Sequence, residues 1–102
     1  MSLKNELSWA IAAEARLRIL QQLAEQNDGQ LSIVMLKRVL DSFGYRRDRD
    51  WIETQLRKLE AVGAVELFAP GGTMVARIAR AGRDHIEERS VLGGVARPSE
   101  AE

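Results

Sequence analysis

The fold is decided by the stretch Ile52-Glu53-Thr54-Gln55-Leu56-Arg57-Lys58-Leu59-Glu60-Ala61-Val62-Gly63-Ala64-Val65. Its first apolar residues recur at spacings of four and three, as on one buried helix face; they are Ile52, Leu56 and Leu59. Asp48 or Asp50 in the first turn suits the positive end of a helix dipole. Gly63 is a typical residue just past a helix end. The pattern predicts a helix over 48–62 that leads directly into extended chain.

Extended chain is predicted after this helix because the apolar period changes to two. The alternating residues of the first run are Val65, Leu67 and Ala69, and those of the second are Met74, Ala76 and Ile78. Pro70-Gly71-Gly72 between them is a strong turn signal, so the two runs form a β-hairpin. A short helix over 81–88 follows. Residues 91–102 mix glycine, proline and charge without a period, so we expect a disordered tail.

Two further helices are predicted before residue 48. The first covers 4–25, and its apolar stripe is formed by Leu7, Ile11, Leu17, Leu20 and Ala24. Trp9 and Ile19 lie off that stripe. The second begins after Ser32, a good N-cap residue, and runs to Phe43. Its inner face is formed by Leu36, Leu40 and Phe43.

Composition restricts the class of protein. The chain has 102 residues, enough for one domain, which we place at 1–90. The absence of cysteine excludes disulfide scaffolds and thiol catalysis and favours the cytoplasm. The charged start does not resemble a signal peptide, and no stretch reaches the roughly 20 apolar residues of a membrane span. Net charge is zero, but residues 31–63 carry seven basic and five acidic side chains.

Three stretches resemble one family of repressors. Residues 14–23 resemble the first helix of ArsR-like repressors, and 52–65 resemble their recognition helix running into the wing. Residues 78–86, with Gly82 inside, are similar to the helix that follows the wing in ArsR and MarR relatives. The whole chain also resembles small ArsR-like regulators encoded in Mu-like prophages. The resemblance to ArsR-like and MarR-like proteins covers about residues 13–90.

This resemblance implies a winged helix-turn-helix domain. Such a domain is mainly α with a small β-hairpin (α+β), and it has a three-helix core, a wing and a short C-terminal helix. The implied function is a DNA-binding transcriptional regulator that acts as a homodimer through its first and last helices. In this chain, Trp9 and Ile19 are the apolar residues that could form the dimer seam.

The candidate DNA-binding residues follow from how a helix fits the major groove. With Ile52 facing inward, a step of 100° per residue places Thr54, Arg57 and Lys58 on the outer side. Arg57 and Thr54 are expected to read bases, whereas the other residues hold phosphates and position the helix. The full set is Arg46, Arg47, Arg49, Thr54, Arg57, Lys58 and, from the wing, Arg77.

The alternative is a winged-helix protein-interaction module that does not bind DNA. A net charge of zero disfavours DNA binding, because phosphate contacts supply most of the affinity of DNA-binding domains. Acids accompany the arginines: Asp48 and Asp50 alternate with them, and Glu53 precedes Arg57 by four residues. His85 is the only histidine, and no nucleophile elbow is present. We therefore expect no metal, no cofactor and no enzymatic activity.

Overall fold

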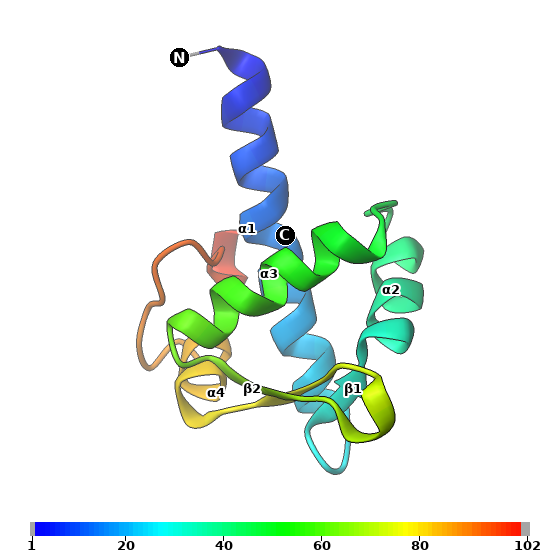
Figure 1. The fold of residues 1–102 in the computed structure, drawn as a ribbon. Helices are drawn as coiled ribbons and strands as arrows, with labels where there is room; N and C mark the ends of the chain where they lie inside the picture. Colours follow the sequence, from blue (N-terminus) through cyan, green and yellow to red (C-terminus); the bar gives the residue numbers. More distant parts are fainter. Residues whose placement is uncertain (1, 101–102) are drawn as a thin grey trace.

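The computed structural model describes residues 2–100 and contains four α-helices and a three-stranded antiparallel sheet within them (Figure 1). The helices are α1 Leu3–Glu25, α2 Ile33–Ser42, α3 Arg49–Ala61 and α4 Arg80–Ile86. The strands are β1 Gln30–Ser32, β2 Val65–Phe68 and β3 Val75–Ile78. Two short 3₁₀ turns lie at Pro70–Gly72 and Pro98–Glu100. The predicted mixed α+β class is confirmed.

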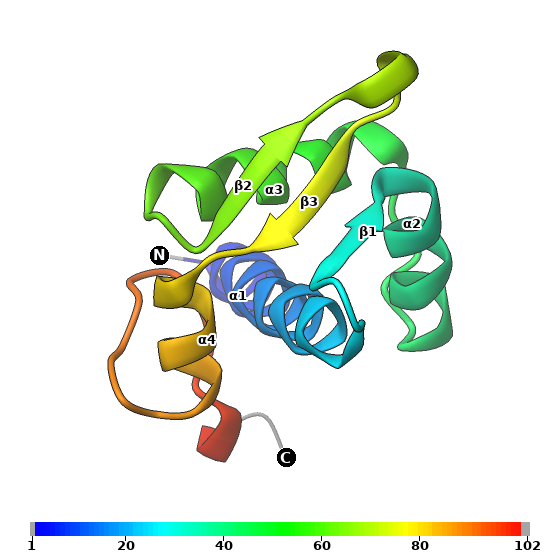
Figure 2. The same ribbon diagram turned by 90° about the horizontal axis from the view of Figure 1, so that it is seen from below.

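The sheet has the order β1-β3-β2, and its strands lie side by side in Figure 2. Ala76 at the centre of β3 is paired with Leu31 of β1 and with Leu67 of β2. The β2–β3 hairpin was predicted, but β1 was not. A strand of three residues is too short to show an alternating pattern, and it exists here because β3 supplies its hydrogen-bonding partner.

The ends of α2 and α3 follow the capping signals in the sequence. The Ser32 hydroxyl accepts a hydrogen bond from the Met35 amide at 3.2 Å, so the predicted N-cap of α2 is confirmed. The Asp48 carboxylate accepts one from the Trp51 amide at 2.8 Å and begins α3 in the same way. Gly63, with φ +77°, follows the end of α3 in the left-handed region that glycine tolerates.

The predicted apolar stripe of α1 is only partly right. Leu17 and Leu20 are fully buried in the core, but Leu7 is exposed. Ile19, which lay off the stripe, is fully buried, so it cannot form part of a dimer seam. The reason is visible in Figure 1: the N-terminal half of α1 projects beyond the other elements, so only its C-terminal half has neighbours to pack against.

Phe43 also differs from its predicted place on the inner face of α2. It is the C-cap residue of that helix, and 44% of it is exposed. Its ring lies against α1, where the Arg18 guanidinium is 5.3 Å from the ring centroid. Phe43 is therefore at the surface beside α1, whereas Leu36 and Leu40 are fully buried.

The prediction of a disordered tail over 91–102 is wrong for the residues that the structure describes. Residues 91–100, which we call the C-terminal segment, fold back onto α1 and α4. Val95 is buried, and the Ala96 amide donates to the Ala13 carbonyl of α1 at 3.1 Å. The folded unit therefore continues to residue 100 instead of ending at 90, while residues 101–102 lie outside the described part. Contacts with α1, which is far away in the sequence, and with His85 of α4 hold this segment, so its own residue pattern carries no signal.

Within residues 2–100, no helix combines the length and the apolar character needed to cross a membrane.

Candidate nucleic-acid interface

Helix α3 lies at the surface with one buried face and one exposed face. Its buried face consists of Ile52, Gln55, Leu56 and Leu59. The exposed face includes three candidates for DNA contact, Thr54, Arg57 and Lys58. The Thr54 hydroxyl donates to the Asp50 carbonyl at 3.1 Å within the helix, which leaves its oxygen available as an acceptor.

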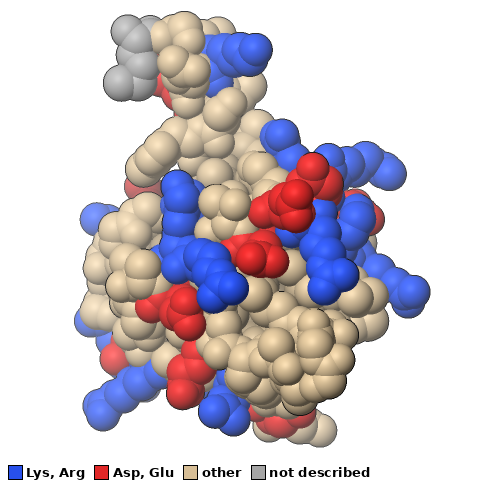
Figure 3. Space-filling model, in the orientation of Figure 1, with Lys and Arg blue, Asp and Glu red and all other residues tan. Residues whose placement is uncertain are grey.

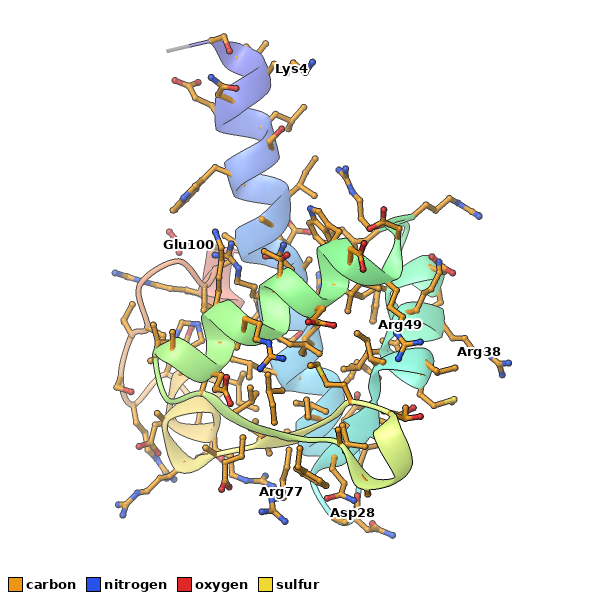
Figure 4. The ribbon with its side chains drawn as sticks, viewed as in Figure 1. Lys4, Asp28, Arg38, Arg49, Arg77 and Glu100 are labelled. Carbon is orange, nitrogen blue, oxygen red and sulfur yellow. The ribbon has the colours of Figure 1, made fainter. Side chains whose placement is uncertain are left out.

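Four exposed arginines lie around the connection between α2 and α3, and we call them the basic corner: Arg38, Arg46, Arg47 and Arg49. None of the four forms an ion pair with another residue in the range 2–100. Figure 3 shows basic side chains gathered on this side of the molecule, with acidic ones among them. In Figure 4, Arg38 and Arg49 lie there on neighbouring helices.

The connection that carries the basic corner is held by contacts of Lys37, Arg47 and Tyr45. The Lys37 ammonium donates to the Arg47 carbonyl at 3.2 Å and pairs with Asp41 at 3.4 Å. The Arg47 guanidinium lies 5.2 Å from the centroid of the Trp51 ring, a cation–π distance. Tyr45 donates its hydroxyl hydrogen to Glu14 of α1. The arginines therefore project from an anchored turn.

Burial raises the pKa of Tyr45 to about 12, with the hydrogen bond to Glu14 and the negative charge of that carboxylate as further causes. The phenol is protonated over a wider pH range in the folded protein than in the unfolded chain. The hydrogen bond that joins α1 to the basic corner is thus intact at neutral pH.

Arg57 has different surroundings from the basic corner. Its guanidinium lies 3.7 Å from Glu53 and 3.7 Å from Glu60, one on each side along α3. Lys58 beside it makes no ion pair within the part of the chain that the structure describes. The middle of the exposed face is therefore close to neutral, and Arg57 would have to leave two carboxylates to reach a base.

The hairpin of β2 and β3 does not bring its candidate residue to the basic corner. Arg77 pairs with Glu66, its cross-strand neighbour, at 3.6 Å, and its guanidinium lies 5.3 Å from the Phe68 ring centroid. Its neighbours Ala76 and Ile78 point into the core, so Arg77 projects from the solvent face of the sheet. Figure 4 shows it well apart from Arg38 and Arg49.

Sequence reasoning missed Arg38 as a site residue. It placed Arg46, Arg47 and Arg49 at the start of α3, but the contribution of α2 depends on how the two helices pack. The basic pair Lys37–Arg38 is a weak signal by itself, because such pairs are common on solvated helix faces.

His85 has no capacity left for a metal ion. It is buried, its Nδ1 accepts from the Leu92 amide at 2.9 Å, and its Nε2 donates to the Ala96 carbonyl at 2.8 Å. No group of three or more His, Cys, Asp or Glu side chains converges anywhere in residues 2–100. The histidine instead holds the C-terminal segment against α4.

Comparisons of the chain with models of known protein families, with curated proteins and with solved structures find no match.

Proposed function

We propose that this protein is a DNA-binding transcriptional regulator with a winged helix-turn-helix fold, in which α3 enters the major groove. The order α1-β1-α2-α3-β2-β3 supports the proposal, since a helix pair joined by a turn is followed by a hairpin wing. The resemblance to ArsR-like and prophage-encoded regulators supports it as well.

The observation that carries the proposal is the basic corner. Four exposed arginines have no ion-pair partner in residues 2–100; Arg46, Arg47 and Arg49 lie at the N-terminal end of α3, and Arg38 lies on the neighbouring helix α2. The positive end of the helix dipole has the same location and also attracts phosphate. In this proposal, Arg38, Arg46, Arg47 and Arg49 hold phosphates.

The remaining candidates have the following roles. Thr54 and Arg57 read base edges, and Lys58 contacts the backbone beside them. The phosphate contacts of the basic corner bring α3 into the groove first, after which Arg57 exchanges Glu53 and Glu60 for a base. Arg77 meets the DNA backbone only where the duplex bends around the hairpin.

The test is binding to random duplex DNA, measured by fluorescence anisotropy over a series of salt concentrations. We expect micromolar or tighter affinity at low salt, with a steep loss as salt rises. The double variant R46A/R49A should lower the affinity and reduce the salt slope by about 2, since each lost phosphate contact reduces it by about 1.

A matched control is Arg80→Ala, which removes one exposed arginine on α4, far from the basic corner in sequence. This variant should bind like the unmodified protein. No binding of the unmodified protein at low salt would refute the proposal, and equal losses from R80A and from the double variant would refute the role of the basic corner.

We also propose that the protein acts as a homodimer through the N-terminal half of α1. Residues 2–10 are all exposed, including Leu7 and Trp9. A short helical segment without tertiary packing is only marginally stable in water. A second copy of the chain would cover its apolar side chains. Sedimentation analysis should give a dimer for the unmodified protein and a monomer for Trp9→Asp, whereas Ser8→Asp should stay dimeric; a monomer without any substitution refutes this proposal.

One observation favours a protein partner as the second candidate function. Residues 67–76, which include the tip of the hairpin, carry no charge. The tip lies beside the start of α2, where the Ile33 amide donates to the Met74 carbonyl, and Val34 and Met35 are exposed there. Phosphates are neutralised by Lys and Arg side chains, and residues 67–76 contain neither. If the protein does not bind DNA, we expect this uncharged surface to bind a protein partner, which a pull-down with the purified protein would detect. The variant Met35→Glu should abolish that binding.

A further inference from the structure

Arg16 of α1 is a buried cation without a carboxylate partner in the described residues. Its exposed fraction is 7%, and no ion pair involves it within residues 2–100. Burial lowers the pKa of its guanidinium, because no anion offsets the desolvation. Two neutral oxygens satisfy it instead: the Gln55 side-chain oxygen accepts from Nε at 2.8 Å, and the Gly94 carbonyl accepts from Nη1 at 2.7 Å.

The first of these hydrogen bonds leads to the basic corner. Gln55 is almost fully buried on the inner face of α3, and its Nε2 donates to the Trp51 carbonyl at 3.2 Å. The Trp51 ring in turn lies against the guanidinium of Arg47. A continuous series of contacts therefore connects Arg16 with an arginine of the proposed DNA-binding surface.

The second hydrogen bond leads to the C-terminal segment. Gly94 has φ +80°, and a Cβ atom built there would lie 3.0 Å from Arg16 Nη1. The segment has three other anchors: the Ala96 amide on the Ala13 carbonyl, the pair of hydrogen bonds to His85, and the Ser99 amide on the Glu88 carboxylate. Only the Gly94 carbonyl reaches the side chain that also holds α3.

We propose that Arg16 is a positioning residue which couples the docking of the C-terminal segment to the orientation of α3, and thereby regulates the basic corner. A buried guanidinium that loses one oxygen partner has to find another, and an unsatisfied buried charge is costly. When the segment leaves, Arg16 turns toward solvent and releases Gln55, so α3 loses its buried polar contact with α1, which lies beside its apolar face. The effect on DNA rests on the proposed function, whereas the coupling itself does not.

A matched pair of glycine variants tests this coupling in the full chain. Gly94→Ala places a methyl group against Arg16 on backbone that alanine rarely adopts. Gly93→Ala, one residue earlier, meets nothing within 4 Å and has no positive φ. Both variants are made with Trp9→Phe, so that Trp51 is the only tryptophan and its fluorescence reports the environment at the start of α3.

We expect G94A to shift the Trp51 emission and to weaken DNA binding about fivefold or more, the lower end of ordinary coupling between two sites. The salt slope should not change, because no phosphate-binding residue is altered. G93A should leave the Trp51 emission, the DNA affinity and the salt slope unchanged. In an R16K background, where the ammonium cannot hold both oxygens in the same geometry, G94A should have no further effect on Trp51.

Unchanged Trp51 emission in G94A overturns the coupling, as does an equal shift in G93A or full additivity of G94A and R16K. If the protein without these substitutions binds no DNA, the proposed function fails, and the fluorescence comparison still decides the coupling. Should R16K not fold, the pair G94A and G93A is sufficient, because both positions lie in a surface segment outside the helical core.

Discussion

The two ends of α3 carry arginines in opposite electrostatic surroundings. At the N-terminal end, Arg46 and Arg49 are exposed and form no ion pair with any residue from 2 to 100. Further along, Arg57 lies between Glu53 and Glu60. The difference shows that the number of arginines on a helix does not measure its capacity for phosphate, because a guanidinium next to carboxylates must first break those contacts.

The largest effect is expected from reversing the charge of the basic corner. The variant R46E/R49E should lower the affinity for random duplex DNA at low salt by about a hundredfold or more, because it removes two phosphate contacts and adds two repulsive charges. Anisotropy titration measures the loss, and circular dichroism checks that the helices remain. If the affinity of R46E/R49E for DNA were within a factor of three of that of the unmodified protein, the arginines at the start of α3 would have no special role in phosphate binding.

Arg57→Ala should have the next largest effect, and only on a specific site. Loss of a bidentate base contact costs about 1–3 kcal/mol on the selected sequence and little on random DNA, while Arg47→Ala should weaken all sequences alike and flatten the salt slope. Both variants are titrated against a selected site and a scrambled one. Equal losses on both DNAs for both variants would contradict this division of roles.

Neutralising the acids beside Arg57 should make the two ends of α3 more alike. The variant E53Q/E60Q keeps the shape of both side chains and removes the two carboxylates, so affinity for random DNA should rise several-fold with a steeper salt slope. Glu25→Gln, an exposed acid at the end of α1, is the control for the change in net charge. An equal rise in that control would mean that only net charge matters.

The smallest effect concerns the anchor of the basic corner at high pH. The pKa of Tyr45 is raised from 10.0 to about 12 in the folded protein, so its contribution to stability is complete below pH 10 and is lost as pH rises toward 12. Chemical denaturation at pH 8, 10 and 11.5 should show a smaller decline for Tyr45→Phe than for the unmodified protein. Parallel declines would mean that folding does not raise the pKa of Tyr45.

Local patterns predicted those parts of the fold whose causes are local. The spacing of Ile52, Leu56 and Leu59, the capping residue Ser32 and the turn at Pro70–Gly72 act within a few residues, and the structure has the corresponding elements. Strand β1 and the burial pattern of α1 were not predictable in this way. Leu7 and Ile19 are equally apolar, and only the placement of the other elements decides that one is exposed and the other buried.

The features of the candidate site can also be separated into those with local causes and those that depend on tertiary contacts. The sequence by itself determined that arginines lie at the start of α3, because an acidic N-cap marks where the helix begins, and that Thr54, Arg57 and Lys58 share its outer face, because helical periodicity sets the face. Only the tertiary structure decided that Arg38 joins the basic corner, that Arg77 projects elsewhere and that residues 91–100 are held in place. Arg16 contacts Gln55 and Gly94 across 39 and 78 residues of sequence. Contacts over such separations form only after the chain has folded, so no local pattern of residues specifies them.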